Sequence, residues 1–157
     1  LDWAKAAADE APRVHYFCPI WMESKGDTPW WMTFNQATYP HALLAIMGGE
    51  NIFAARERRY PLAADLAAGE AEDAAGRDTR YPRVTVDEII AGEPELILLP
   101  SEPYAFEARH KAEVETLLAF TPAVKRGRVK LVDGSLLTWH GVRLGRALQD
   151  LPELFFV

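Results

Sequence analysis

The feature that most constrains this chain is the alternation of short apolar runs with segments patterned as helices. The apolar runs lie at 14–18 (VHYFC), within 95–100 (ELILLP) and within 128–132. Helical patterns stand between and after them, at 38–47, 85–91, 105–119 and 140–149. Strands that alternate with helices predict an α/β fold, a three-layer sandwich with a mainly parallel sheet covered by helices on both faces.

The loops that follow the strands carry large aromatic residues. Right-handed crossovers place these loops along one edge of the sheet, and ligands of open α/β sheets bind beyond that edge. The segment 19–35 is interpreted as one long aromatic loop, which either packs on the core or binds something. The aromatic residues after the strands are Trp21, Trp30, Trp31, Tyr104 and Trp139.

Composition excludes several classes of protein. Aspartate and glutamate outnumber lysine and arginine by 23 to 17, and a net charge of -6 argues against nucleic acid as a partner. No apolar run approaches the ~18 residues that span a bilayer. The single cysteine, Cys18, rules out an internal disulfide and a multi-cysteine zinc site, and it is expected to be a small buried residue at a strand end.

Two segments differ from the rest in composition. Residues 1–12 are rich in alanine and end at a proline, which indicates the last turns of a helix that enters from upstream or the frayed first helix of a small protein. Residues 62–80 are rich in alanine and charge, with Leu62 and Leu66 as their only larger aliphatic residues. We expect 62–80 to be an exposed insertion held by few contacts.

The motifs of common enzyme chemistry are absent from the sequence. It contains no G-x-G-x-x-G, Walker A or G-x-S-x-G pattern, and its four histidines have no metal-binding spacing. His15 lies in a predicted strand and is expected to be a satisfied core histidine. Near the strand ends, only His140 and Glu102 could act as acid or base, so we predict no catalytic residue and no protein-only metal site.

Three stretches in order resemble the helical-backbone solute-binding proteins of ABC importers for iron-siderophore complexes, haem and cobalamin. They are 29–54 (PWWMTFNQATYPHALLAIMGGENIFA), 80–90 (RYPRVTVDEII) with the strand that follows at 93–100, and 131–143 (LVDGSLLTWHGVR). The second stretch resembles the YP-x-V-x-x-E helix of that family. The resemblance implies two α/β lobes joined by a long helix. It identifies 13–157 as the C-terminal lobe and 1–12 as the end of the connecting helix, with the N-terminal lobe missing.

The resemblance also implies roles for individual residues. Trp31, Met32, Tyr81 and Trp139, with His140 beside it, match positions that face the ligand cleft. Tyr104 is added from its place at a strand end. Asp87 or Glu88 matches the acid that pairs with arginines of the permease, and Thr85 with Glu88 forms a helix capping box.

The function so implied is capture and delivery of a metal chelate (cobalamin, ferric siderophore or haem) without an intrinsic cofactor. The partners would be an ABC-importer permease, the missing lobe and, at the open cleft face, another copy of the chain. The location would be periplasmic or otherwise extracytoplasmic, in free or membrane-anchored form. Two alternatives stay open: an enzyme or metal-cluster protein of the same architecture, and an α/β interaction module without a small ligand.

Overall fold

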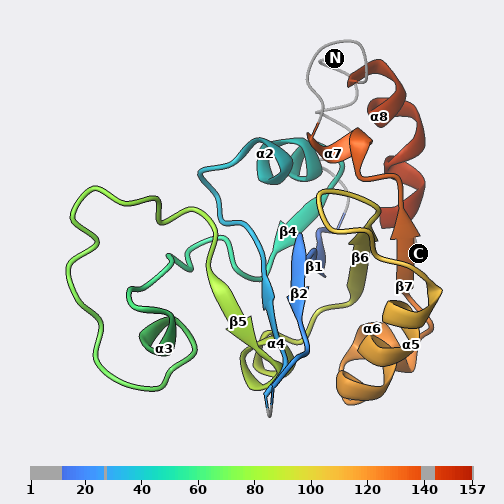
Figure 1. The fold of residues 1–157 in the computed structure, drawn as a ribbon. Helices are drawn as coiled ribbons and strands as arrows, with labels where there is room; N and C mark the ends of the chain where they lie inside the picture. The colour runs from blue at the N-terminus through green and yellow to red at the C-terminus, as the bar shows by residue number, and fades with distance from the viewer. Residues whose placement is uncertain (1–11, 27, 139–143, 157) are drawn as a thin grey trace.

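A four-stranded parallel sheet forms the centre of the computed structural model, which describes residues 12–26, 28–138 and 144–156 (Figure 1). All neighbouring strands in it are parallel, so the predicted parallel arrangement is confirmed. In spatial order the strands are β4 (Gly49–Asn51), β1 (Val14–Phe17), β6 (Leu96–Pro100) and β7 (Val129–Val132). Tyr16 of β1 lies opposite Leu96 of β6, and Leu99 of β6 lies opposite Leu131 of β7.

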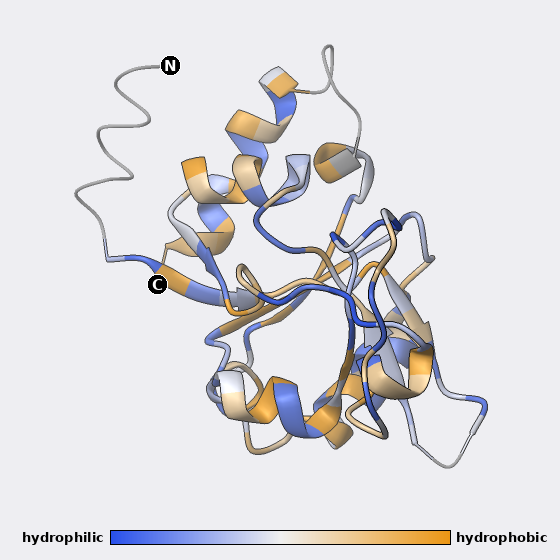
Figure 2. Cartoon of the chain, turned by 90° about the vertical axis from the view of Figure 1, so that its left-hand side faces the viewer, coloured by the Kyte–Doolittle hydropathy of each residue, from blue (hydrophilic) through white to orange (hydrophobic). Residues whose placement is uncertain are grey.

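Helices cover both faces of this sheet, as the three-layer prediction requires. Figure 2 shows apolar and polar residues side by side along these helices, which is typical of elements with one face on a core. One face carries α2 (Tyr39–Ile46), α7 (Ser135–Thr138), α8 (Leu144–Asp150) and the 3-10 helix η2 (Pro152–Phe155); the other carries α4 (Val86–Gly92), α5 (Ala108–Leu117) and α6 (Pro122–Lys125).

The strand β6 explains why two cores form. All five of its residues are buried, and successive side chains of a strand point to opposite faces. Leu96 and Leu98 therefore pack in the core under α2, α7 and α8, while Ile97 and Leu99 pack in the core under α4, α5 and α6. Each fully buried side chain of this kind stabilises the fold by about 1.5–3 kcal/mol.

A second, antiparallel sheet corrects the prediction for 19–35. That segment is a hairpin of β2 (Trp21–Glu23) and β3 (Trp30–Met32), not a long loop, and β3 pairs in turn with β5 (Arg83–Thr85). Two strands of three residues around Pro29 give too short a pattern to distinguish from a loop in the sequence.

Residues 57–80 extend from the lobe as a long excursion with one short helix, α3 (Leu62–Asp65), seen at the left of Figure 1; we call this segment the arm. Most of its side chains are exposed, but Ala64 and Asp65 are buried. The prediction of few contacts is wrong, because polar groups at both roots of the arm converge on the Asp65 carboxylate, as described below.

Other predicted elements are present with shifted ends. The helices expected at 38–47, 85–91 and 105–119 correspond to α2, α4 and α5, whereas α7 was not predicted. Residues 1–11, and with them nearly all of the proposed connecting helix, lie outside the described residues. Within the described ranges, every helix falls short of the length and apolar character that a bilayer crossing requires.

A candidate ligand-binding pocket at the carboxyl end of the sheet

A pocket of about 620 Å³ opens where the chain leaves the carboxyl ends of β1 and β6. The loop after β1 contributes Ile20, and the loop after β6 contributes Pro103. This is the edge at which open α/β sheets bind ligands. The described residues that line it are Ile20, Trp21, Met32, Phe34, Tyr39, Pro40, Arg80, Tyr81 and Pro103.

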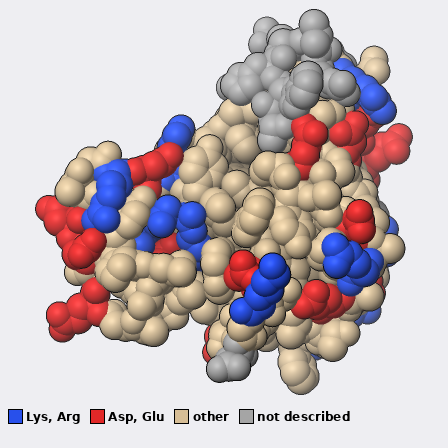
Figure 3. Space-filling view, viewed as in Figure 1, with Lys and Arg blue, Asp and Glu red and all other residues tan. Residues whose placement is uncertain are grey.

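The wall of the pocket is mainly aromatic. Four of the lining residues have aromatic rings, and Arg80 is the one charged residue among them. Phe34 is fully buried and forms part of the floor, while Trp21 keeps 41% of its surface exposed. Figure 3 shows a broad uncharged area across the middle of the molecule, beside the charges gathered on the arm. Such a wall suits a flat or bulky ligand with much apolar surface.

The hairpin β2–β3 decides which aromatic residues face the pocket. Trp21 pairs with Met32 across the hairpin, and Met22 pairs with Trp31. Directly opposite residues of an antiparallel pair lie on the same face, and the next pair lies on the other face. Trp21 and Met32 therefore line the pocket, whereas Met22 and Trp31 pack in the core.

The placement of Trp31 corrects the sequence prediction. Its side chain has no exposed surface, and its ring packs edge-on against Phe17 with centroids 6.4 Å apart. Among the described residues its Nε1 donor has no hydrogen-bond partner. Neighbouring residues of a strand point to opposite faces, so Trp31 cannot face the cleft when Met32 does. If the hairpin had been recognised in the sequence, Trp21 would have been predicted to face the cleft in place of Trp31.

Tyr81 and Arg80 reach the pocket because the pairing of β3 with β5 continues beyond the strands. The Thr33 amide donates to the Pro82 carbonyl at 3.0 Å, and the Asn35 amide donates to the Arg80 carbonyl at 2.9 Å. This ladder holds residues 80–82 alongside 33–35, next to Phe34. Tyr81 thus lies where the sequence placed it, and its contact with a ligand stays a prediction.

Tyr104 lies one layer behind the pocket and is not among its lining residues. Its ring packs edge-on against Trp21 at 5.1 Å between centroids, so it supports the wall rather than forming it. The His110 Nδ1 accepts the Glu107 amide at 2.9 Å, which leaves the ring proton on Nε2 to donate to the Tyr104 hydroxyl at 3.2 Å. Tyr104 therefore lies beside the pocket, and its contact with a ligand stays a prediction.

Trp139 and His140 lie outside the described residues, so their place in the cleft stays a prediction.

The two candidate docking acids have different environments. Asp87 is exposed on the first turn of α4, and the Glu88 amide donates to the Thr85 hydroxyl at 3.3 Å. The Glu88 carboxylate does not reach back to complete the capping box; it accepts from the Arg56 Nε at 3.1 Å. Burial alone would lower the pKa of Arg56, but its bonds to Glu88 and Asp65 raise it. Asp87 is therefore the freer of the two for docking.

The structure also defines the environments of Cys18 and His15, two reactive side chains that the sequence singled out. Cys18 is buried, as predicted, and burial raises the pKa of its thiol, so the nucleophilic thiolate is disfavoured. His15 is not a core residue: half its side chain is exposed, and its Nδ1 lies 3.0 Å from the Glu95 carboxylate. Among the described residues, no three potential ligands cluster in a way that could hold a metal ion.

No protein-family model matches the chain, and no curated protein matches it in sequence. Solved structures do share its fold. The periplasmic vitamin B12 binding protein BtuF of Vibrio cholerae has 16% identity and a TM-score of 0.63, and the match covers 98% of this chain and 48% of that one. The periplasmic heme-binding protein RhuT from Roseiflexus sp. RS-1 has 20% identity and a TM-score of 0.63, covering 98% and 50%.

A third match is the ABC-type Fe3+-hydroxamate transport system from Saccharomonospora viridis. It has 14% identity and a TM-score of 0.67, and the match covers 99% of this chain and 45% of that one. The chain spans about half the length of each of these structures. At such identities the likeness shows the fold: a mainly parallel α/β unit like half of a periplasmic solute-binding protein.

Proposed function

We propose that this chain is the C-terminal lobe of the substrate-binding component of an ABC importer and that it captures a metal chelate such as cobalamin, haem or a ferric siderophore. The observation that carries the proposal is the aromatic pocket at the carboxyl end of the parallel sheet. Trp21, Met32, Tyr39 and Tyr81 come from separate elements and present one largely apolar wall. Rigid aromatic rings bind large flat surfaces with little loss of side-chain entropy.

The matched structures support the class of ligand. Their names record vitamin B12, heme and Fe3+-hydroxamate, all of them bulky metal complexes. The pocket has the size and apolar wall for part of such a complex, and the exposed ring of Trp21 stands at an open rim. The match covers about half of each solved structure. A second lobe like the other half of those structures would form the opposite wall of the pocket.

The pocket supports binding rather than catalysis. Among its described lining residues there is no nucleophile and no acid–base pair, since Arg80 is the one charged side chain. In the proposed transport cycle the pocket holds the chelate outside the cytoplasm, and Asp87 on α4 offers an exposed acid for contact with the permease. Rim charges of this kind mainly guide encounter and orientation.

The test is a titration of the purified chain with cobalamin, haemin and a ferric hydroxamate, followed by tryptophan fluorescence. Trp21 lines the pocket, so binding there should quench its emission. Tyr81→Ala should weaken binding about fivefold to thirtyfold, because it removes a large aromatic contact worth ~1–2 kcal/mol.

The matched control is Phe156→Ala. Phe156 is 73% exposed and lines a smaller cavity beside Arg13 and Val14, at the amino end of β1. Its loss should leave the affinity unchanged. Because one lobe forms only one wall of the site, the titration extends to the solubility limit of each chelate. If none of the three chelates binds at that limit, or if the two variants bind equally well, the proposed function is wrong.

A further inference from the structure

Asp78 orients the guanidinium of Arg80 at the rim of the pocket. Its Nε donates to Oδ1 of Asp78 at 3.0 Å, and its Nη2 donates to Oδ2 at 2.9 Å. The Arg80 amide also donates to the Asp78 carboxylate, at 2.9 Å. These hydrogen bonds lower the pKa of Asp78 to about 2, so the pair stays fully charged at neutral pH. The guanidinium lies 5.3 Å from the centre of the Tyr81 ring, which is part of the pocket wall.

Asp78 occupies one edge of the guanidinium and leaves the other edge available. A guanidinium has five N–H donors in a planar fork, and the bidentate contact with Asp78 uses two of them. Within the described part of the chain, no other acceptor takes the Nη1 donors. About half of the Arg80 side chain is exposed. The free edge has the geometry that binds a second carboxylate with two parallel hydrogen bonds.

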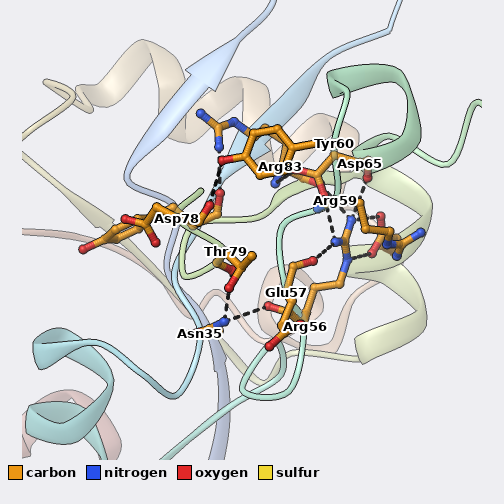
Figure 4. A network of polar contacts seen from close by, with 11 residues as sticks. Asn35, Arg56, Glu57, Arg59, Tyr60, Asp65, Asp78, Thr79 and Arg83 are labelled. Atoms are coloured by element: carbon orange, nitrogen blue, oxygen red, sulfur yellow. Dashed lines mark hydrogen bonds and ion pairs between the residues drawn. The ribbon is translucent and has the colours of Figure 1, made fainter. Parts of the chain in front are cut away.

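The arm is built so that Asp78 and Arg80 are fixed. The Tyr60 hydroxyl donates to the Asp78 carbonyl at 2.8 Å. The Tyr60 ring in turn lies against the guanidinium groups of Arg58 and Arg77, at 4.2 and 3.9 Å from the ring centre. Figure 4 shows Tyr60 and Asp78 within one polar network at the base of the arm.

The roots of the arm are joined to the pocket side of the lobe. The Asn35 side-chain amide donates to the carbonyls of Arg56 and Thr79, one on each root, at 3.2 and 3.3 Å. The Arg58 amide donates to the Thr79 carbonyl at 2.9 Å. Figure 4 shows Asn35 between the two roots of the arm. Asn35 follows Phe34 of the pocket floor, so the arm is joined to the pocket.

We propose that Arg80 binds a carboxylate at the edge of the ligand while the aromatic wall holds its flat body, and that the arm is the element that sets this specificity. The inference rests on the proposed function and narrows it: the chain selects chelates with peripheral carboxylates over chelates with uncharged edges. Charge-assisted hydrogen bonds are roughly twice as strong as neutral ones, so one such contact decides between otherwise similar ligands. The exposed Asp78–Arg80 pair is itself a weak interaction, so a second carboxylate can share the guanidinium at small cost.

The test compares two ligands that differ in this charge alone, haemin with two free carboxylates and haemin dimethyl ester, in the same solvent mixture. A ferric carboxylate siderophore, a ferric hydroxamate and cobalamin complete the panel. The wild-type chain should bind haemin or the carboxylate siderophore at least tenfold more tightly than the ester, the hydroxamate or cobalamin. Arg80→Gln should remove this preference, weakening the carboxylate ligand about tenfold and leaving the uncharged ligands unchanged.

Arg109→Gln is the matched control, because Arg109 is also exposed and also pairs with an acid two positions earlier, Glu107. It should change no affinity. Equal binding of charged and uncharged ligands, or an Arg80→Gln variant that keeps the preference, overturns this inference and leaves the proposed function intact. Binding of no ligand in the panel overturns the proposed function and this inference with it.

Discussion

At the scale of single residues, Asp65 is a buried acid whose carboxylate is held by hydrogen bonds. It is fully buried, yet it carries a carboxylate with three donors around it. Oδ1 accepts from the Arg56 Nη1 at 2.8 Å and from the Arg59 amide at 3.0 Å, and Oδ2 accepts from the Arg83 amide at 2.8 Å. A buried charge is tolerated when it is paired and hydrogen-bonded in this way. One acid therefore ties both roots of the arm to β5.

Asp65→Asn should destabilise the chain by about 3–5 kcal/mol, the usual cost of breaking a buried, hydrogen-bonded ion pair. The asparagine amide cannot accept from both Arg56 and the two backbone amides at once. Urea unfolding, followed by circular dichroism, measures the change. Glu70→Gln is the control, because Glu70 is an exposed acid of the same arm. Equal unfolding midpoints for the two variants would show that Asp65 does not anchor the arm.

At the scale of elements, Gly134 before α7 makes the closest approach to another segment among the described glycines, and that segment is the loop after β6. A Cβ added at Gly134 would lie 2.5 Å from both the backbone nitrogen and the carbonyl oxygen of Glu102. Backbone atoms cannot move aside as a flexible side chain can. The residue before α7 therefore has to be glycine for the two loops at the carboxyl ends of β6 and β7 to meet.

Gly134→Ala should lower the free energy of unfolding by about 1–3 kcal/mol through this overpacking. It should also weaken ligand binding, because the displaced loop carries Pro103 of the pocket wall. Gly26→Ala is the control, since a Cβ there meets nothing within 4 Å. Thermal unfolding of both variants tests the prediction, and an unchanged melting temperature for Gly134→Ala would contradict it.

The sequence predicted elements with a strong pattern and missed those that depend on pairing. The run Leu96–Pro100 is apolar at every position, which is typical of a strand buried on both faces. This pattern therefore predicts the parallel sheet. The hairpin β2–β3 has three residues a side, and only its pairing reveals that Trp21 faces the pocket and Trp31 the core.

The arm shows a different limit of sequence reasoning. Its alanine-rich composition indicates an exposed segment, and most of its side chains are exposed. The sequence does not distinguish Asp65 from the other acids of the arm, because only the fold brings Arg56 and Arg83 beside it. In the same way, Glu88 fits a capping box in the sequence, and only the fold supplies the competing arginine. Met32 and Tyr81 both line the pocket. Met32 is the last residue of the paired strand β3, and Tyr81 lies just before its partner strand β5, so the pairing brings the two together.

At the scale of the whole molecule, the two ends of the parallel sheet differ in character. The carboxyl end opens into the aromatic pocket, with the arm and Arg80 on its rim. The amino end has the smaller cavity lined by Arg13, Val14 and Met47. The central claim is that a metal chelate binds at the carboxyl end, on the wall formed by Trp21, Met32 and Tyr81.

The chain's three methionines make this claim directly measurable. Met32 lines the pocket, Met22 is buried in the core beneath the hairpin, and Met47 lies at the smaller cavity. Methyl NMR of methionine-labelled protein should be recorded during titration with whichever chelate quenches tryptophan fluorescence, using gallium in place of iron. The account predicts a saturable shift of the Met32 methyl while the Met47 methyl stays in place. A shift of Met47 with Met32 unmoved would contradict it.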